Sequence, residues 1–161
     1  MILERSIFVG VTIVALLLIF AIPKEKYRLA LIAFSVMQFI TTILGHVAVQ
    51  TGALIYPVHE FAKVNQTSFV YEFLAFPMMC AIFNVYYPVQ QSRLWQIGYY
   101  ILFCTVLTVA EVFIERYTNL IHYIKWNWFW TWGLIFVTLF ITRVICVVFF
   151  RTIRLDHENR I

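Results

Sequence analysis

Three glutamates and three histidines are the residues of this chain whose types and placement could do chemistry: Glu72, Glu111, Glu115, His46, His59 and His122. Glu72 and Glu111 lie within long apolar runs. A charged side chain at the centre of a membrane-spanning helix costs about 2.5–3.5 kcal/mol, so these carboxylates should point into the protein, toward a partner, a ligand or trapped water. Glu111 and Glu115 are four residues apart and would share one face of a helix.

Several kinds of chemistry fit this set of side chains. Carboxylate and imidazole groups suit a divalent metal ion, and Glu111, Glu115, His59 and His122 are the candidate ligands. Two close carboxylates could instead split their pKa values and act as acid and base on a lipid or isoprenoid. Proton or ion translocation also fits these residues, and so does a purely structural network that fixes the helix register. The chain has no HExxH motif, phosphate-binding loop or G-x-S-x-G elbow, so the sequence favours binding over catalysis and leaves an enzyme open.

The elements that must position these residues are membrane helices. The chain of 161 residues is 63% hydrophobic and 12% charged, with a mean hydropathy of +0.85. Soluble domains carry about 45–50% apolar and about 25% charged residues, so lipid is the expected solvent. An open sheet cannot satisfy its backbone in lipid, which makes the predicted fold an all-α bundle. Five apolar runs of about the length that crosses a bilayer predict transmembrane helices at 6–22, 29–49, 68–87, 97–116 and 128–150.

Lysine and arginine predict the orientation of this bundle. With five spans, seven basic residues fall on one side: Lys24, Lys26, Arg28, Arg93, Arg151, Arg154 and Arg160. Four fall on the other side: Arg5, Lys63, Arg116 and Lys125. The larger group is expected in the cytoplasm, which places the N-terminus outside and the tail 151–161 inside. The net charge of +4 is spread over segment ends, so it does not indicate nucleic-acid binding.

The two longer connections lie on the outer side in this topology. Pro57 could begin a short interfacial or re-entrant helix between the second and third spans. Four tryptophans resemble an interfacial belt: Trp126, Trp128, Trp130 and Trp132. All six candidate residues then fall at one depth, which predicts an outer pocket that binds a cation or polar ligand. A membrane interaction partner or a second copy of the chain is the other kind of partner expected. Arg143, inside the last span, is expected to reach the inner interface, with Asn84 as a partner.

Two stretches of the chain carry a resemblance. YPVHEFAKVNQTSFVYEFLAFPMMCAIFN (Tyr56 to Asn84) and EVFIERYTNLIHYIKWNWFWTW (Glu111 to Trp132) resemble a family of small multi-helix membrane proteins of endospore-forming Gram-positive bacteria. The resemblance implies a location in the plasma membrane and a shared helix plan, and it brings no activity. The shorter run YEFLAFP is also similar to a segment of membrane lycopene cyclase domains, which implies acid/base chemistry, although this chain has only Glu72 where those domains have an acidic pair.

Overall fold

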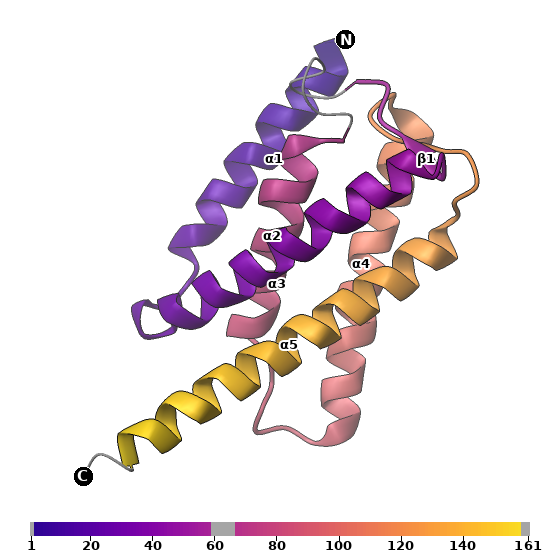
Figure 1. The fold of residues 1–161 in the computed structure, drawn as a ribbon. Helices are drawn as coiled ribbons and strands as arrows, with labels where there is room; N and C mark the ends of the chain where they lie inside the picture. The colour runs from indigo at the N-terminus through magenta and orange to yellow at the C-terminus, as the bar shows by residue number, and fades with distance from the viewer. Residues whose placement is uncertain (1, 59–66, 159–161) are drawn as a thin grey trace.

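Four long helices dominate the computed structural model, which describes residues 2–58 and 67–158 (Figure 1). These helices are α1 (Ile2–Phe20), α2 (Tyr27–Gln50), α4 (Arg93–Tyr117) and α5 (Trp128–Glu158). Each contains a stretch long and apolar enough to cross a membrane. The predicted all-α class is confirmed, and four of the predicted spans match these helices to within a few residues.

The third predicted span, 68–87, is the exception. It folds as a π-helical segment, η2 (Val70–Ala75), followed by the α-helix α3 (Phe76–Val85). Together these segments are shorter than the roughly 20 residues that span a bilayer core. The structure therefore shows four candidate spans and one shorter apolar helix, and five crossings stay a prediction.

A short antiparallel strand pair joins the two long connections, and the sequence analysis did not predict it. The strands β1 (Leu54–Ile55) and β2 (His122–Tyr123) pair antiparallel, with Leu54 opposite Tyr123. Gly52 has a φ of 65°, the left-handed conformation that glycine adopts readily, and it turns the chain from α2 into β1. The helix predicted to begin at Pro57 falls largely on residues 59–66, which lie outside the described residues.

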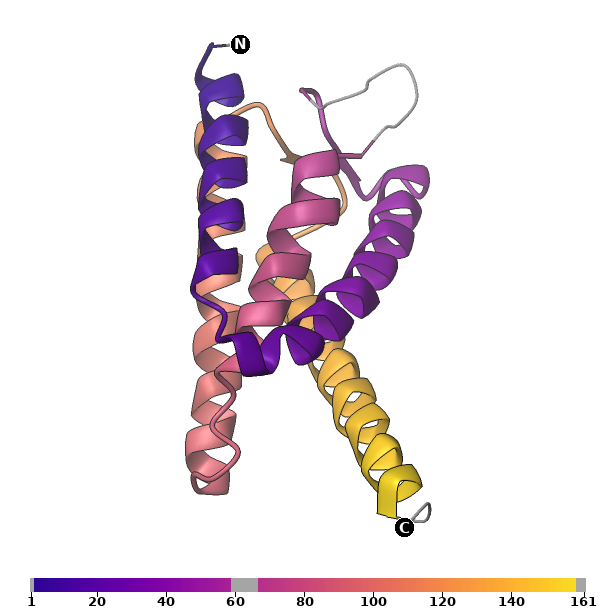
Figure 2. The ribbon, with the colours of Figure 1, turned by 90° about the vertical axis from the view of Figure 1, so that its left-hand side faces the viewer.

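Polar contacts hold the two ends of the bundle. At one end the ammonium group of Lys26, the last residue of the short turn η1 (Lys24–Lys26), donates to Val85 O at 2.6 Å. We call this the basic end, because Lys24, Arg28 and Arg93 also lie there. At the other end, the paired-strand end, Asn119 Nδ2 donates to Glu4 Oε1 at 3.3 Å. Figure 2 shows the two chain termini at opposite ends of the molecule.

The helix α3 lies at the centre of the bundle. Seven of its ten residues are buried, and it contacts α1, α2 and α5. The Phe83 ring lies at 4.8–5.6 Å from the rings of four aromatic neighbours: Tyr87, Tyr99, Tyr100 and Phe103. The outer helices expose many large apolar side chains, including Leu17, Phe39 and Phe113, as helices surrounded by lipid do.

The π-helical register of η2 has a cause in the sequence. Phe76 N–H donates to Tyr71 O, five residues back, and so does not bond to Glu72 O as it would in an α-helix. In the same register Pro77 would be the donor to Glu72 O, but proline has no N–H. The Thr41 hydroxyl of α2 lies 2.8 Å from Glu72 O and 2.9 Å from Met37 O of its own helix. This hydroxyl supplies the donor that Glu72 O lacks within its own helix.

Replacing Thr41 by valine should therefore destabilise the protein. The change removes this donor and leaves a buried carbonyl without one, which costs about 1–3 kcal/mol. Thr41→Ser keeps the hydroxyl and should stay within about 0.5 kcal/mol of the wild type. Unfolding of the purified protein by dodecyl sulfate titration in detergent micelles measures both; equal losses would contradict the role given to the hydroxyl.

Candidate functional site

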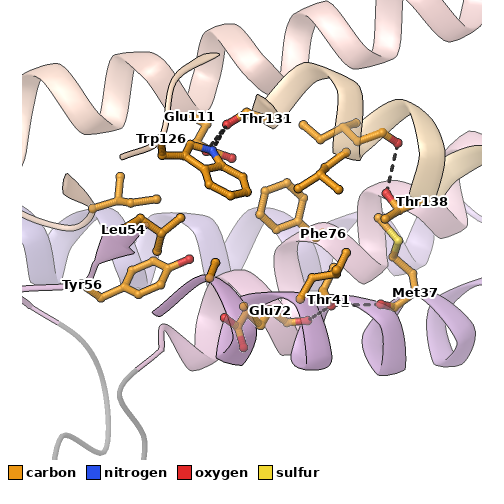
Figure 3. Close-up of a pocket in the computed structure, with 16 residues that line it drawn as sticks. Met37, Thr41, Leu54, Tyr56, Glu72, Phe76, Glu111, Trp126, Thr131 and Thr138 are labelled. Carbon is orange, nitrogen blue, oxygen red and sulfur yellow. Dashed lines mark hydrogen bonds between the residues drawn. The ribbon is translucent and has the colours of Figure 1, made fainter. Parts of the chain in front are cut away.

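A cavity of about 100 Å³ lies at the paired-strand end, between α2, η2, α4 and α5 (Figure 3). Glu72 and Glu111 both line it, so two carboxylates from distant parts of the sequence meet at one space. The remaining polar or aromatic wall is formed by Thr41, Tyr56, Phe76, Trp126, Thr131 and Thr138. Most of the wall is apolar, and electrostatic interactions in such a space are stronger than in water.

Glu111 is held by two hydroxyl groups from beyond its own helix. Its Oε1 accepts hydrogen bonds from Tyr123 Oη at 2.6 Å and from Thr131 Oγ1 at 2.8 Å. Trp126 Nε1 in turn donates to Thr131 Oγ1 at 2.8 Å. Tyr123 comes from β2 and Thr131 from the first turns of α5, so the loop between α4 and α5 folds back over Glu111.

The two tyrosines of the connections carry hydroxyls that stay protonated. Burial, reinforced by the Glu111 carboxylate, raises the pKa of Tyr123 above its usual value. Burial, and after it the Glu72 and Glu111 carboxylates, raise the pKa of Tyr56. Both hydroxyls are therefore donors over the whole physiological pH range.

Glu72 has a different environment from Glu111. It is 3% exposed, and its Oε2 accepts a hydrogen bond from Thr67 Oγ1 at 2.9 Å. Its Oε1 is buried and has no hydrogen-bond partner in the described part of the chain. Gly45 of α2 makes room for this carboxylate, because a Cβ at that position would overlap Oε1. One oxygen of Glu72 is thus buried at the cavity without a donor.

A second, larger cavity adjoins the first. It has about 330 Å³, lies between α1, η2, α3 and α4, and is lined almost wholly by apolar side chains. Tyr56, Phe76, Glu111 and Ile121 line both cavities. An apolar chain could therefore lie in the larger cavity with one end at Glu111.

The other predicted site residues do not line the small cavity. Glu115 is half-buried on α4, and His122 lies in β2 opposite Ile55. His46 is exposed, and its Nδ1 lies 2.8 Å from Thr42 O one turn back, which requires the tautomer with the proton on Nδ1. His59 lies outside the described residues.

The structure describes three of the four predicted metal ligands. Within residues 3–58 and 67–152, whose side chains the structure describes, no group of three His, Cys, Asp or Glu side chains is placed to hold a metal ion. Because His59 is not among the described residues, the site formed by Glu111, Glu115, His59 and His122 stays a prediction.

Sequence reasoning missed the roles of Tyr56, Trp126 and Thr131. The sequence predicts Trp126 in an interfacial belt, yet its indole N–H points to Thr131, whereas Trp128 and Trp130 are exposed as a belt requires. Thr131 and Thr138 share one polar face of the last span, and both are buried at the cavity. That periodic face was the signal that could have led to them.

Comparison with protein-family models, curated proteins and solved structures found no match.

Thr131→Val should cost about 1–3 kcal/mol, because Glu111 loses a donor and the Trp126 indole loses its acceptor. The matched control is Thr138→Val on the same helix and the same cavity. Among the described residues Thr138 bonds to Ile135 O of its own helix alone, so the loss of its hydroxyl should stay within about 0.5 kcal/mol. Dodecyl sulfate titration compares the two variants, and a Thr138 effect as large as that of Thr131 would show that the network adds nothing.

Proposed function

We propose that the protein is a membrane-embedded binding protein that holds the ammonium group of an organic amine between Glu72 and Glu111. The observation that carries the proposal is the buried Oε1 of Glu72, which has no donor in the described residues and belongs to one of two carboxylates at one apolar cavity. The hydrogen-bond donors to the two carboxylates in the described residues are the neutral side chains of Thr67, Tyr123 and Thr131, and a cationic ligand would add the positive charge that these donors lack.

A protonated amine fits this cavity better than a bare metal ion. Zinc needs about four ligands and calcium six to eight, whereas two carboxylates and a largely apolar wall offer fewer. An ammonium group needs only a few acceptors, and the rings of Tyr56, Phe76 and Trp126 favour a cation beside them. The adjoining cavity of about 330 Å³ would take the apolar part of the amine.

The same larger cavity supports a second candidate, an enzyme that acts on a lipid or isoprenoid. In that case Glu111, which meets both cavities, would serve as an acid or base at the end of the hydrocarbon chain. The two candidates differ in what they require of a ligand. An amine-binding protein needs a positive charge, whereas a site for hydrocarbon chemistry binds charged and neutral chains alike.

We further propose that the chain crosses a bacterial plasma membrane five times, with its N-terminus outside and its C-terminus in the cytoplasm. The short apolar helix Val70–Val85 would be the fifth crossing, and the basic end would face the cytoplasm. The candidate site then opens toward the outer half of the membrane. A reporter enzyme fused to the C-terminus tests the orientation, since activity outside the cell would contradict it.

Octylamine and octanol are matched probes for the amine site, because they share a hydrocarbon chain and differ in charge at neutral pH. At ten times its dissociation constant octylamine should stabilise the purified protein by about 1.4 kcal/mol. The thermal midpoint should then rise by about 3–6 °C in detergent, and octanol should give no specific rise.

The matched variants are Glu72→Gln and Glu115→Gln. Glu72→Gln removes a charge at the cavity and should abolish the rise, whereas Glu115→Gln removes a charge that does not line it and should leave the rise intact. Equal octylamine-induced rises in the thermal midpoint of the wild type, Glu72→Gln and Glu115→Gln would refute the amine site. Equal rises with octylamine and octanol, both lost in Glu111→Gln, would favour the hydrocarbon site instead.

A further inference from the structure

A third cavity, of about 410 Å³, lies at the basic end, far along the bundle from Glu72 and Glu111. It opens between η1, the start of α2, the end of α3 and the last turns of α5. Its polar wall includes Lys26, Arg28, Asn84, Tyr87 and Arg143, with one carboxylate, that of Glu25. Three cations against one anion give this wall a net positive charge.

Arg143 is the residue that most needs a ligand there. It lies within the membrane-spanning part of α5 and is half-buried. Its guanidinium lies 4.3 Å above the centre of the Tyr87 ring, and no carboxylate with a described side chain pairs with it. This cation–π contact holds the guanidinium beside the ring and leaves N–H groups for an acceptor. A planar guanidinium binds a phosphate group through two parallel hydrogen bonds.

The neighbouring polar groups complete a site with both donors and an acceptor. Lys26 is fixed by its bond of 2.6 Å to Val85 O, and its ammonium keeps further N–H groups. Asn84 is 2% exposed and donates through Nδ2 to Cys80 O at 3.0 Å. Its Oδ1 is buried without a hydrogen-bond partner in the described residues, so it can accept from a hydroxyl. These hydrogen bonds do not include Arg143, so they do not show the direct pairing of Asn84 with Arg143 that the sequence predicts.

We propose that this basic cavity binds a phosphate ester that carries a free hydroxyl, with the phosphate at Arg143, Lys26 and Arg28 and the hydroxyl at Asn84. The headgroup of an anionic glycerophospholipid has this chemistry, and a free phosphate ester shares it in part. The lipid is favoured because part of the wall is apolar and includes Leu29, Val147 and Phe150, where acyl chains would lie. Basic cavities between membrane helices on the cytoplasmic side bind such headgroups.

The test is native mass spectrometry of the full-length protein in detergent, titrated with phosphatidylglycerol or with phosphatidylcholine of the same acyl chains. The wild type should bind phosphatidylglycerol at least about fivefold more tightly, the effect of about one cation near an anionic lipid. Arg143→Gln and Arg28→Gln should each weaken phosphatidylglycerol about fivefold and leave phosphatidylcholine unchanged. Arg28 is exposed, so its variant carries the test if Arg143→Gln does not fold.

Arg93→Gln is the matched control, because Arg93 lies at the same end of the bundle but outside the cavity. It should leave lipid binding unchanged. An equal loss in Arg93→Gln, or no preference for phosphatidylglycerol, overturns the proposal. A separate experiment titrates glycerol 1-phosphate. Saturable binding that is lost in Arg143→Gln supports the site and assigns it to a soluble phosphate ester. No binding of glycerol 1-phosphate supports the lipid as the ligand.

Discussion

A polar group buried among apolar helices must find its partner inside the protein, and the rest of this structure depends on how that constraint is met at Glu72 and Glu111. Glu111 meets it with donors from the α4–α5 connection, namely Tyr123 and Thr131. Glu72 meets it only in part, because the Thr67 hydroxyl donates to one of its oxygens and the other oxygen has no donor in the described residues. The preference for a cationic donor that we propose for the cavity rests on this difference between the two carboxylates.

The local irregularities of the fold serve the same constraint. Pro77 removes the intrahelical donor to Glu72 O, and Thr41 of α2 replaces it, which ties η2 to α2. Gly45 allows the Glu72 carboxylate to lie against that helix. Pairing of β1 with β2 fixes the connection that carries Tyr123 over Glu111. Each irregularity would weaken an isolated helix or loop, and together they place both carboxylates at one space.

The sequence predicted the features that follow from hydropathy and helix length, and missed those that depend on which way a helix face turns. Four apolar runs became long helices, and Glu72 and Glu111, which the sequence predicts at one depth, line one cavity. Depth alone could not tell that His46 lies on an exposed face. Two-residue strands have no periodicity to detect, so Tyr56 and Tyr123 could not be placed. The spacing of Glu72 and Pro77 did carry a readable signal for the π-helix.

The central claim, that Glu72 and Glu111 share one cavity, is tested most directly by a double-mutant cycle on the free energy of unfolding. Two carboxylates that are both ionised in one apolar space repel each other, and either single change to glutamine would relieve the same repulsion. The protein carrying both Glu72→Gln and Glu111→Gln should therefore be less stable than the sum of the single effects, by about 0.5–3 kcal/mol, while Glu72→Gln with Glu115→Gln should be additive. Additivity of Glu72→Gln and Glu111→Gln within about 0.5 kcal/mol would contradict a shared site.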